Sequence, residues 1–159
     1  MAMVCASRSH QIGLWWLPMG KGKGKGVNSE TLKPIWKQIR DRAKKLKITK
    51  PVLIYDRATV HKSKATQTEL DRVFGAGNHE QQAAKSPDTN NGDAGVFPNA
   101  ARVTACSGAA NKDEVMAVVT KWFKTVDTQM LEAVDDRVLR NYERILELNG
   151  GNFYDESRV

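Results

Sequence analysis

Hydrophobic and polar positions alternate between helical and strand-like spacing along the chain, which predicts a mixed α/β domain. Short apolar runs at 12–17 and 52–55 predict buried strands. Apolar residues at helical spacing predict four helices, which are expected to begin near Asn28 or Ser29, Ser63, Asp113 and Asp127. Several of these residues are also typical N-caps, so pattern and capping chemistry agree.

The segments without periodicity set the expected boundaries. Residues 1–11 are interpreted as a loose lead-in, and residues 155–159 as a tail. Residues 78–95 are rich in Asn, Gln, Asp, Gly and Ser, which predicts a long mobile loop. Val96 and Phe97 are predicted to open another short strand. The expected organisation is one domain over 12–154.

Length and apolar content are consistent with one domain outside the membrane. The chain has 159 residues, of which 40% are hydrophobic, enough for a modest core. It lacks a run of about 18 apolar residues, the length needed to span a bilayer. Residues 1–20 lack the order of a secretory signal. We therefore expect a soluble, intracellular protein.

Positive charge is concentrated in the first part of the chain. The net charge is +7, yet residues 1–64 hold 15 Lys and Arg against 3 Asp and Glu. This density favours a phosphate-bearing partner, although a solvated basic surface explains it equally well. Lys21, Lys23 and Lys25 alternate with glycines in a loop that either follows a nucleic-acid backbone or is a flexible linker.

Asp56 is the leading candidate for chemistry. It follows the apolar run 52–55, and open α/β sheets place their sites at such strand ends. Arg57, Lys62 and Lys64 surround it with positive charge, which suits a polyanion. His61 is interpreted as a residue of the turn before the next helix rather than as a general base.

The order of elements and motifs resembles the DDE superfamily of transposases of the Tc1/mariner type. The family segment Asp-Asn-Ala-x-x-His-x-Ser is similar to Asp56-Arg57-Ala58-Thr59-Val60-His61-Lys62-Ser63. Further similar segments are Gly26-Val27-Asn28-Ser29, Val96-Phe97-Pro98-Asn99-Ala100-Ala101, and 141–152. The resemblance implies an RNase H-like (ribonuclease H-like) fold, incomplete at its N-terminal side.

The resemblance also implies a site. In this family three acids bind two divalent ions, Mg²⁺ or Mn²⁺, and Asp56 matches the second acid. For the third acid, one alignment gives Glu114, with Asp113 in reserve, and another places Ala110 there, which would mark its loss. The first acid has no counterpart, because no Asp or Glu precedes Glu30. Arg57 stands where the family usually has Asn.

Three hypotheses follow. The first is a fragment of a DDE transposase or endonuclease that cleaves and joins DNA, with activity left open by its incomplete triad. The second is a non-catalytic nucleic-acid-binding module that uses Lys21, Lys23, Lys25, Arg57, Lys62 and Lys64. The third is a structural relic or an interaction protein, without retained activity. The expected partner is DNA in the nucleus, with a homodimer or larger transposase complex as a further option.

Overall fold

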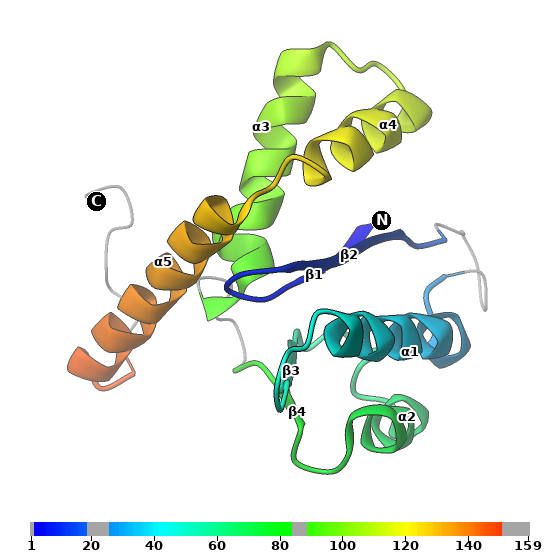
Figure 1. The fold of residues 1–159 in the computed structure, drawn as a ribbon, viewed down its shortest axis with the longest axis vertical. Coiled ribbons are helices and arrows are strands. Elements are labelled where there is room, and N and C mark those ends of the chain that lie inside the picture. The colour runs from blue at the N-terminus through cyan, green and yellow to red at the C-terminus, as the bar shows by residue number, and fades with distance from the viewer. Residues whose placement is uncertain (1, 19–25, 84–88, 151–159) are drawn as a thin grey trace.

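The computed structural model describes residues 2–18, 26–83 and 89–150, and it places strands between two groups of helices (Figure 1). The elements in chain order are β1 (Ala2–Ala6), β2 (Gln11–Trp16), α1 (Ser29–Lys45), β3 (Leu53–Tyr55), α2 (Lys64–Phe74), β4 (His79–Gln81), a π-helical turn η2 (Gly92–Val96), α3 (Phe97–Ser107), α4 (Lys112–Phe123) and α5 (Thr128–Glu147). The predicted α/β class is confirmed.

The first strand corrects the expectation of a loose lead-in. β1 pairs antiparallel with β2, with Ala2 opposite Trp16, and the register shifts between Cys5 and Ala6. A strand of five residues is too short for its own periodicity to be conclusive. Its conformation depends on the hydrogen bonds to β2, which a search for local patterns does not detect.

A second pair of strands carries Asp56. β3 lies parallel to β4, with Leu53 opposite His79 and Tyr55 opposite Gln81. Leu53 and Tyr55 are buried, whereas Ile54 on the opposite face is 59% exposed. This strand was predicted from the sequence, and it ends directly before Asp56.

The predicted loop 78–95 is only partly a loop. It contains β4 at its start and η2 at its end, while residues 84–88 lie outside the described part of the chain. The predicted strand at Val96 and Phe97 is wrong, because η2 continues directly into α3. Pro98 lies in the first turn of α3, where its missing N–H and fixed φ are compatible with a helix.

Helix ends follow the capping rules used for the prediction. The side chains of Asn28, Ser63 and Asp127 each accept a hydrogen bond from a backbone N–H in the first turn of the helix that follows. Pro34 lies inside α1, at its sixth residue. The three predicted caps are confirmed.

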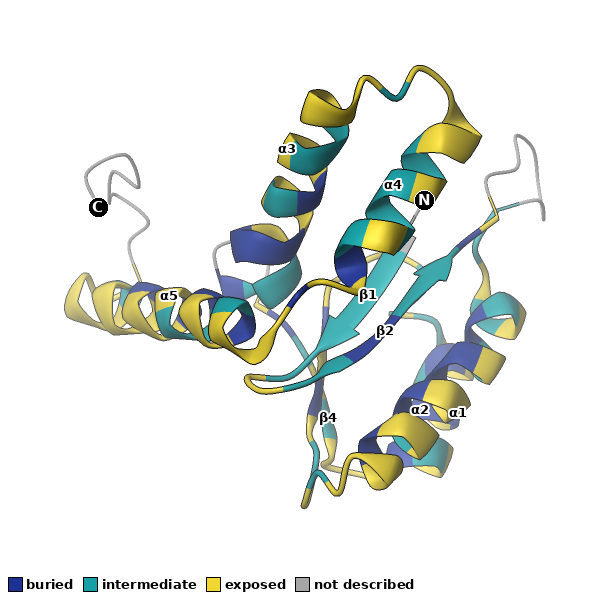
Figure 2. Cartoon of the chain, turned by 45° about the horizontal axis from the view of Figure 1, so that its top comes forward, coloured by how far each residue is buried: buried dark blue, intermediate teal, exposed yellow. Residues whose placement is uncertain are grey.

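The main core lies between α1, α2 and the strands. Leu32, Trp36 and Leu70 are at most 1% exposed, and Ile12 and Leu53 pack in the same cluster. On the opposite face of the β1–β2 hairpin, a smaller cluster contains Phe123, Val126 and Leu131. Figure 2 shows the buried face of each helix turned inward. Within the described residues, no helix has the length and apolar character that crossing a membrane requires.

Candidate metal and nucleic-acid site

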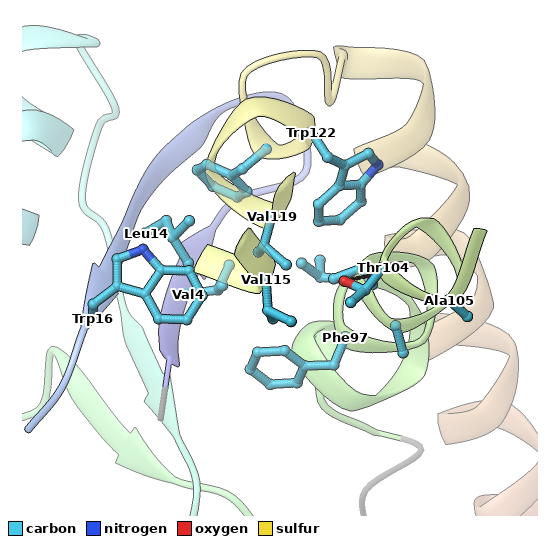
Figure 3. Close-up of a pocket in the computed structure, with 13 residues that line it drawn as sticks. Val4, Leu14, Trp16, Phe97, Thr104, Ala105, Val115, Val119 and Trp122 are labelled. Carbon is cyan, nitrogen blue, oxygen red and sulfur yellow. Dashed lines mark hydrogen bonds between the residues drawn. The ribbon is translucent and has the colours of Figure 1, made fainter. Parts of the chain in front are cut away.

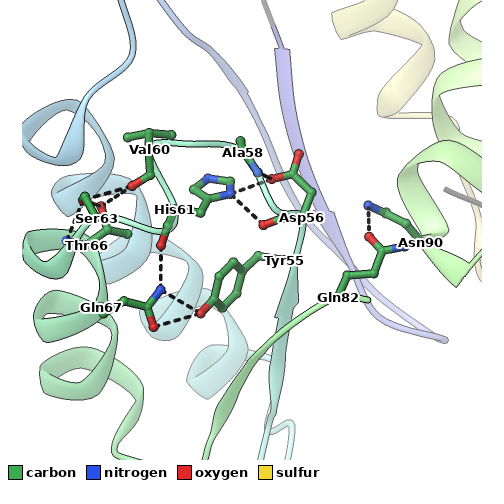
Figure 4. Close-up of polar contacts among 10 residues, drawn as sticks. All are labelled: Tyr55, Asp56, Ala58, Val60, His61, Ser63, Thr66, Gln67, Gln82 and Asn90. Atoms are coloured by element: carbon green, nitrogen blue, oxygen red, sulfur yellow. Dashed lines mark hydrogen bonds and ion pairs between the residues drawn. The ribbon is translucent and has the colours of Figure 1, made fainter. Parts of the chain in front are cut away.

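The candidate site begins in the turn that connects β3 to α2. The carbonyl oxygen of Val60 accepts hydrogen bonds from the hydroxyls of Ser63 and Thr66, at 3.1 and 2.8 Å. The amide of Gln67 donates to the carbonyl oxygen of His61 at 2.6 Å and to the Tyr55 hydroxyl at 3.0 Å. Figure 4 shows these bonds on one side of Asp56. The turn is therefore fixed by side chains of α2.

Asp56 is held by two donors of this turn. Its Oδ1 accepts from the backbone N–H of Ala58 at 3.0 Å and from Nδ1 of His61 at 2.6 Å. The hydrogen bond from His61 is the main reason that the pKa of Asp56 is lowered. Partial burial raises this pKa, and the hydrogen bond from the Ala58 N–H lowers it further. Asp56 is consequently ionised at neutral pH while its side chain remains 55% exposed.

A second carboxylate lies within electrostatic range of Asp56. Asp93 belongs to η2, and its pKa is raised by desolvation and by the negative charge of Asp56. The charge of Asp56 therefore reaches Asp93 in the folded chain, although α2, β4 and residues 84–88 lie between them in the sequence. Asp93 was not among the predicted site residues, because it lies in the segment that was predicted to be a loop.

Glu114 and Asp113, the acids aligned with the third family ligand, lie elsewhere. Both belong to the first turn of α4, which Asn111 caps. The Glu114 carboxylate accepts from the N–H of Ala110 at 2.7 Å, which is the main reason that its pKa is lowered. Figures 1 and 2 place the start of α4 at the far end of the α3–α4 pair, away from β3 and β4. The structure does not bring these acids to Asp56.

The basic residues of the prediction are distributed around the turn. Arg57, Lys62 and Lys64 are exposed, so they are accessible to a large polyanion. Lys21, Lys23 and Lys25 lie outside the described residues. α1 adds exposed cations on its solvent side, at Lys37, Lys44 and Lys45. Contact with DNA by these residues stays a prediction.

The donor set fits a hard divalent cation in its chemistry. Asp56 and Asp93 offer carboxylate oxygens, the ligands that Mg²⁺ and Mn²⁺ prefer. Within residues 2–18, 26–83 and 89–150, no three Asp, Glu, His or Cys side chains form a group that could hold a metal ion. Among the described residues, Asp56 and Asp93 are therefore the two candidate ligands at this end of β3.

Solved structures show a similar fold. The Mos1 transposase paired-end complex with left transposon end is 18% identical, with a TM-score of 0.75 over 96% of this chain and 44% of that chain. The Mos1 catalytic domain with raltegravir and Mn is 19% identical, with a TM-score of 0.75 over 96% of this chain and 76% of that one. The Mos1 strand transfer complex is 20% identical, with a TM-score of 0.73 over 96% and 44%.

Comparisons by sequence add no relative: no protein-family model matches the chain, and no curated protein matches it. The chain spans less than half of the transposase chain in the paired-end complex. At these identities the likeness establishes the arrangement of the backbone. The described structure confirms the fold that the motifs imply: this chain has the RNase H-like fold of the Mos1 transposase catalytic domain.

Proposed function

We propose that this chain is the larger part of a DDE transposase catalytic domain, in which Asp56 and Asp93 bind a divalent cation beside DNA. The proposal is supported by one observation within this fold: the pKa of Asp93 in η2 is raised by desolvation and, to a smaller extent, by the negative charge of Asp56 at the end of β3. Two carboxylates that repel each other in this way are a typical arrangement for binding a cation.

The roles of the two acids follow from their surroundings. Asp56 is kept ionised by His61 and Ala58, so it can bind a cation without first losing a proton. Asp93 holds its proton more tightly, because desolvation and the charge of Asp56 raise its pKa, and a cation held by these two acids would favour its ionised form. When bound, Mg²⁺ or Mn²⁺ would activate the attacking oxygen and stabilise the leaving oxygen of a phosphodiester.

Arg57, Lys62 and Lys64 would orient the DNA in this proposal. They are exposed on the turn that carries Asp56, so they can contact phosphates on either side of a cleaved bond. A carboxylate pair holds Mg²⁺ weakly, because the ion releases its water reluctantly. We therefore expect a third carboxylate from outside the described residues, or from a second chain, to complete the site. A DNA substrate of this kind would place the protein in the nucleus.

The proposal is tested by nicking of supercoiled plasmid DNA in the presence of Mn²⁺. Asp56→Asn and Asp93→Asn should each abolish nicking, since each removes a negative ligand while keeping the side-chain shape. Glu114→Gln is the matched control, because it removes an acid at the start of α4, and it should nick like the wild type. Nicking that persists in Asp56→Asn and Asp93→Asn would contradict the proposal.

A second candidate function is nucleic-acid binding without catalysis. It is favoured by the exposed cations of α1 and of the Asp56 turn. The logarithm of the binding constant should fall linearly with the logarithm of the salt concentration, because each neutralised phosphate releases counterions. Lys62→Gln combined with Lys64→Gln should reduce the slope by about 2 if both side chains contact phosphates. Binding that does not depend on salt would exclude this function.

A further inference from the structure

The two oxygens of Asp56 have different surroundings. Oδ1 accepts both hydrogen bonds, from Ala58 and from His61, whereas Oδ2 accepts none from the described residues. Figure 4 shows the second oxygen pointing away from the His61 ring. The hydrogen bonds therefore leave one oxygen of the carboxylate available for a ligand.

The His61 ring is itself fixed by aromatic neighbours. Its centroid lies 5.6 Å from the Trp36 ring and 5.6 Å from the Tyr55 ring, and both contacts are edge-to-face. Its side chain is 13% exposed. The main chain of His61 is held as well, since its carbonyl accepts from Gln67. Trp36 is among the most buried side chains of α1, so the ring rests on the main core.

We propose that His61 is a positioning residue, which holds the Asp56 carboxylate in one rotamer so that Oδ2 faces the cation. The inference rests on the proposed function, because it gives a role to a neighbour of the proposed metal ligand. A carboxylate can only accept, so Nδ1 of His61 carries the donated proton in this contact. Donors of this kind fix ligand orientation in metal sites.

A purely structural role for His61 makes a different prediction. If the ring only fills space between Trp36 and Tyr55, an aromatic ring without a donor should replace it. If the hydrogen bond matters, a shorter side chain with a donor near the Nδ1 position should replace it. His61→Phe keeps the packing and removes the donor, while His61→Asn keeps a donor and loses the ring.

Two measurements separate these roles. Three-bond NMR couplings report the χ1 rotamer of Asp56 without metal, and the EPR signal of free Mn²⁺ reports binding. We expect one Asp56 rotamer in the wild type and in His61→Asn, and averaged rotamers in His61→Phe. The Mn²⁺ affinity of His61→Phe should fall by about 10- to 100-fold, with most of it recovered in His61→Asn. Unfolding midpoints show whether each variant is folded.

The outcomes distinguish this inference from the function on which it rests. An unchanged Asp56 rotamer in His61→Phe would overturn the positioning role, whatever the metal does. The positioning role would also be overturned if wild type and His61→Phe bound Mn²⁺ equally well while Asp56→Asn bound it more weakly. Equal affinities of wild type and Asp56→Asn would instead overturn the proposed metal site, and with it the metal-directed role of His61.

Discussion

The two faces of the β1–β2 hairpin are packed differently. On the face toward α1 and α2, Leu32, Trp36 and Leu70 are almost completely buried. On the face toward α3 and α4, an apolar cavity of about 490 Å³, open to solvent, lies between the hairpin and the helices beside the smaller Phe123 cluster. Figure 3 shows Leu14 and Trp16 on one side of this cavity and Val119 and Trp122 on the other.

This difference explains where a precise site can form. Asp56 lies at the end of a strand in the closely packed part, and its His61 partner contacts Trp36 in the same core. Glu114 lies at the start of α4, whose apolar face lines the cavity at Val115 and Val119. Sites that need fixed geometry depend on support from well-packed neighbours. The packing therefore favours the Asp56 side.

The largest expected effect is on stability in the closely packed part. Leu70→Ala should lower the free energy of unfolding by about 2–5 kcal/mol, because it leaves a cavity where a fully buried side chain packs in the main core. Val119→Ala should cost about 1 kcal/mol or less, since its side chain already borders a cavity. Urea denaturation measures both. Leu139→Ala, on the exposed side of α5, is the control. Equal losses of stability in Leu70→Ala and Val119→Ala would contradict the difference in packing.

Larger side chains should change the free energy of unfolding with opposite signs in the main core and beside the cavity. Leu70→Phe is expected to lose about 1–3 kcal/mol by overpacking. Val119→Leu should gain about 0.5 kcal/mol or more, because the added methylene can enter the cavity. Unfolding curves in urea again give both values. A loss of stability in Val119→Leu would mean that the cavity closes in solution.

Two helix caps of similar chemistry can be compared, one beside the Asp56 turn and one at the start of α4. Ser63→Ala and Asn111→Ala should each cost about 1 kcal/mol, because each removes the acceptor at the start of a helix. Only Ser63→Ala should also weaken Mn²⁺ binding, since Ser63 holds the turn of Asp56. The two variants are compared by denaturation and by EPR. Equal Mn²⁺ affinities would show that the turn is held without this cap.

A smaller effect is the dependence of stability on pH. Because the folded pKa of Asp56 is lowered from 3.8, its stabilising contribution is present above that value and is lost as pH falls through the lowered pKa. Asp93 has the opposite sign: its raised pKa gives a contribution that is present in acid and lost as pH rises through it. Near neutral pH, Asp56→Asn should therefore be less stable than wild type and Asp93→Asn more stable. Both differences should shrink in acid.

The reactivity of the two cysteines compares the hairpin with α3, because Cys5 lies on β1 and Cys106 on α3. Burial raises the pKa of the Cys5 thiol to about 12, so it has little reactive thiolate near pH 8. Cys106 is exposed on α3. Iodoacetamide should therefore label Cys106 in the folded protein and Cys5 only after unfolding, as read by mass spectrometry. Rapid labelling of Cys5 would show that the hairpin opens.

Local patterns predicted the parts of the fold that depend on neighbouring residues. The caps at Asn28, Ser63 and Asp127 and the strand before Asp56 were correct, because capping and apolar spacing are local. β1 was missed because its hydrogen bonds come from another strand. The stretch at Val96 has too few residues for its period to distinguish a strand from a helix.

The candidate site was predicted only in part for a related reason. Asp56 stands out in the sequence, because it ends an apolar run and begins a family-like motif. Asp93 is one of several polar residues in an irregular segment, and only the folded chain shows that the charge of Asp56 contributes to its raised pKa. Glu114 was selected by aligning a short motif, and in the structure its carboxylate binds Ala110 at the start of α4.

The most direct test of the central claim is the affinity for Mn²⁺, measured by EPR on three proteins: wild type, Asp93→Asn and Glu114→Gln. If Asp56 and Asp93 form the site, Asp93→Asn should weaken binding by about tenfold or more, and Glu114→Gln should bind like the wild type. A loss of affinity in Glu114→Gln, with Asp93→Asn unaffected, would contradict the account and assign the cation to α4.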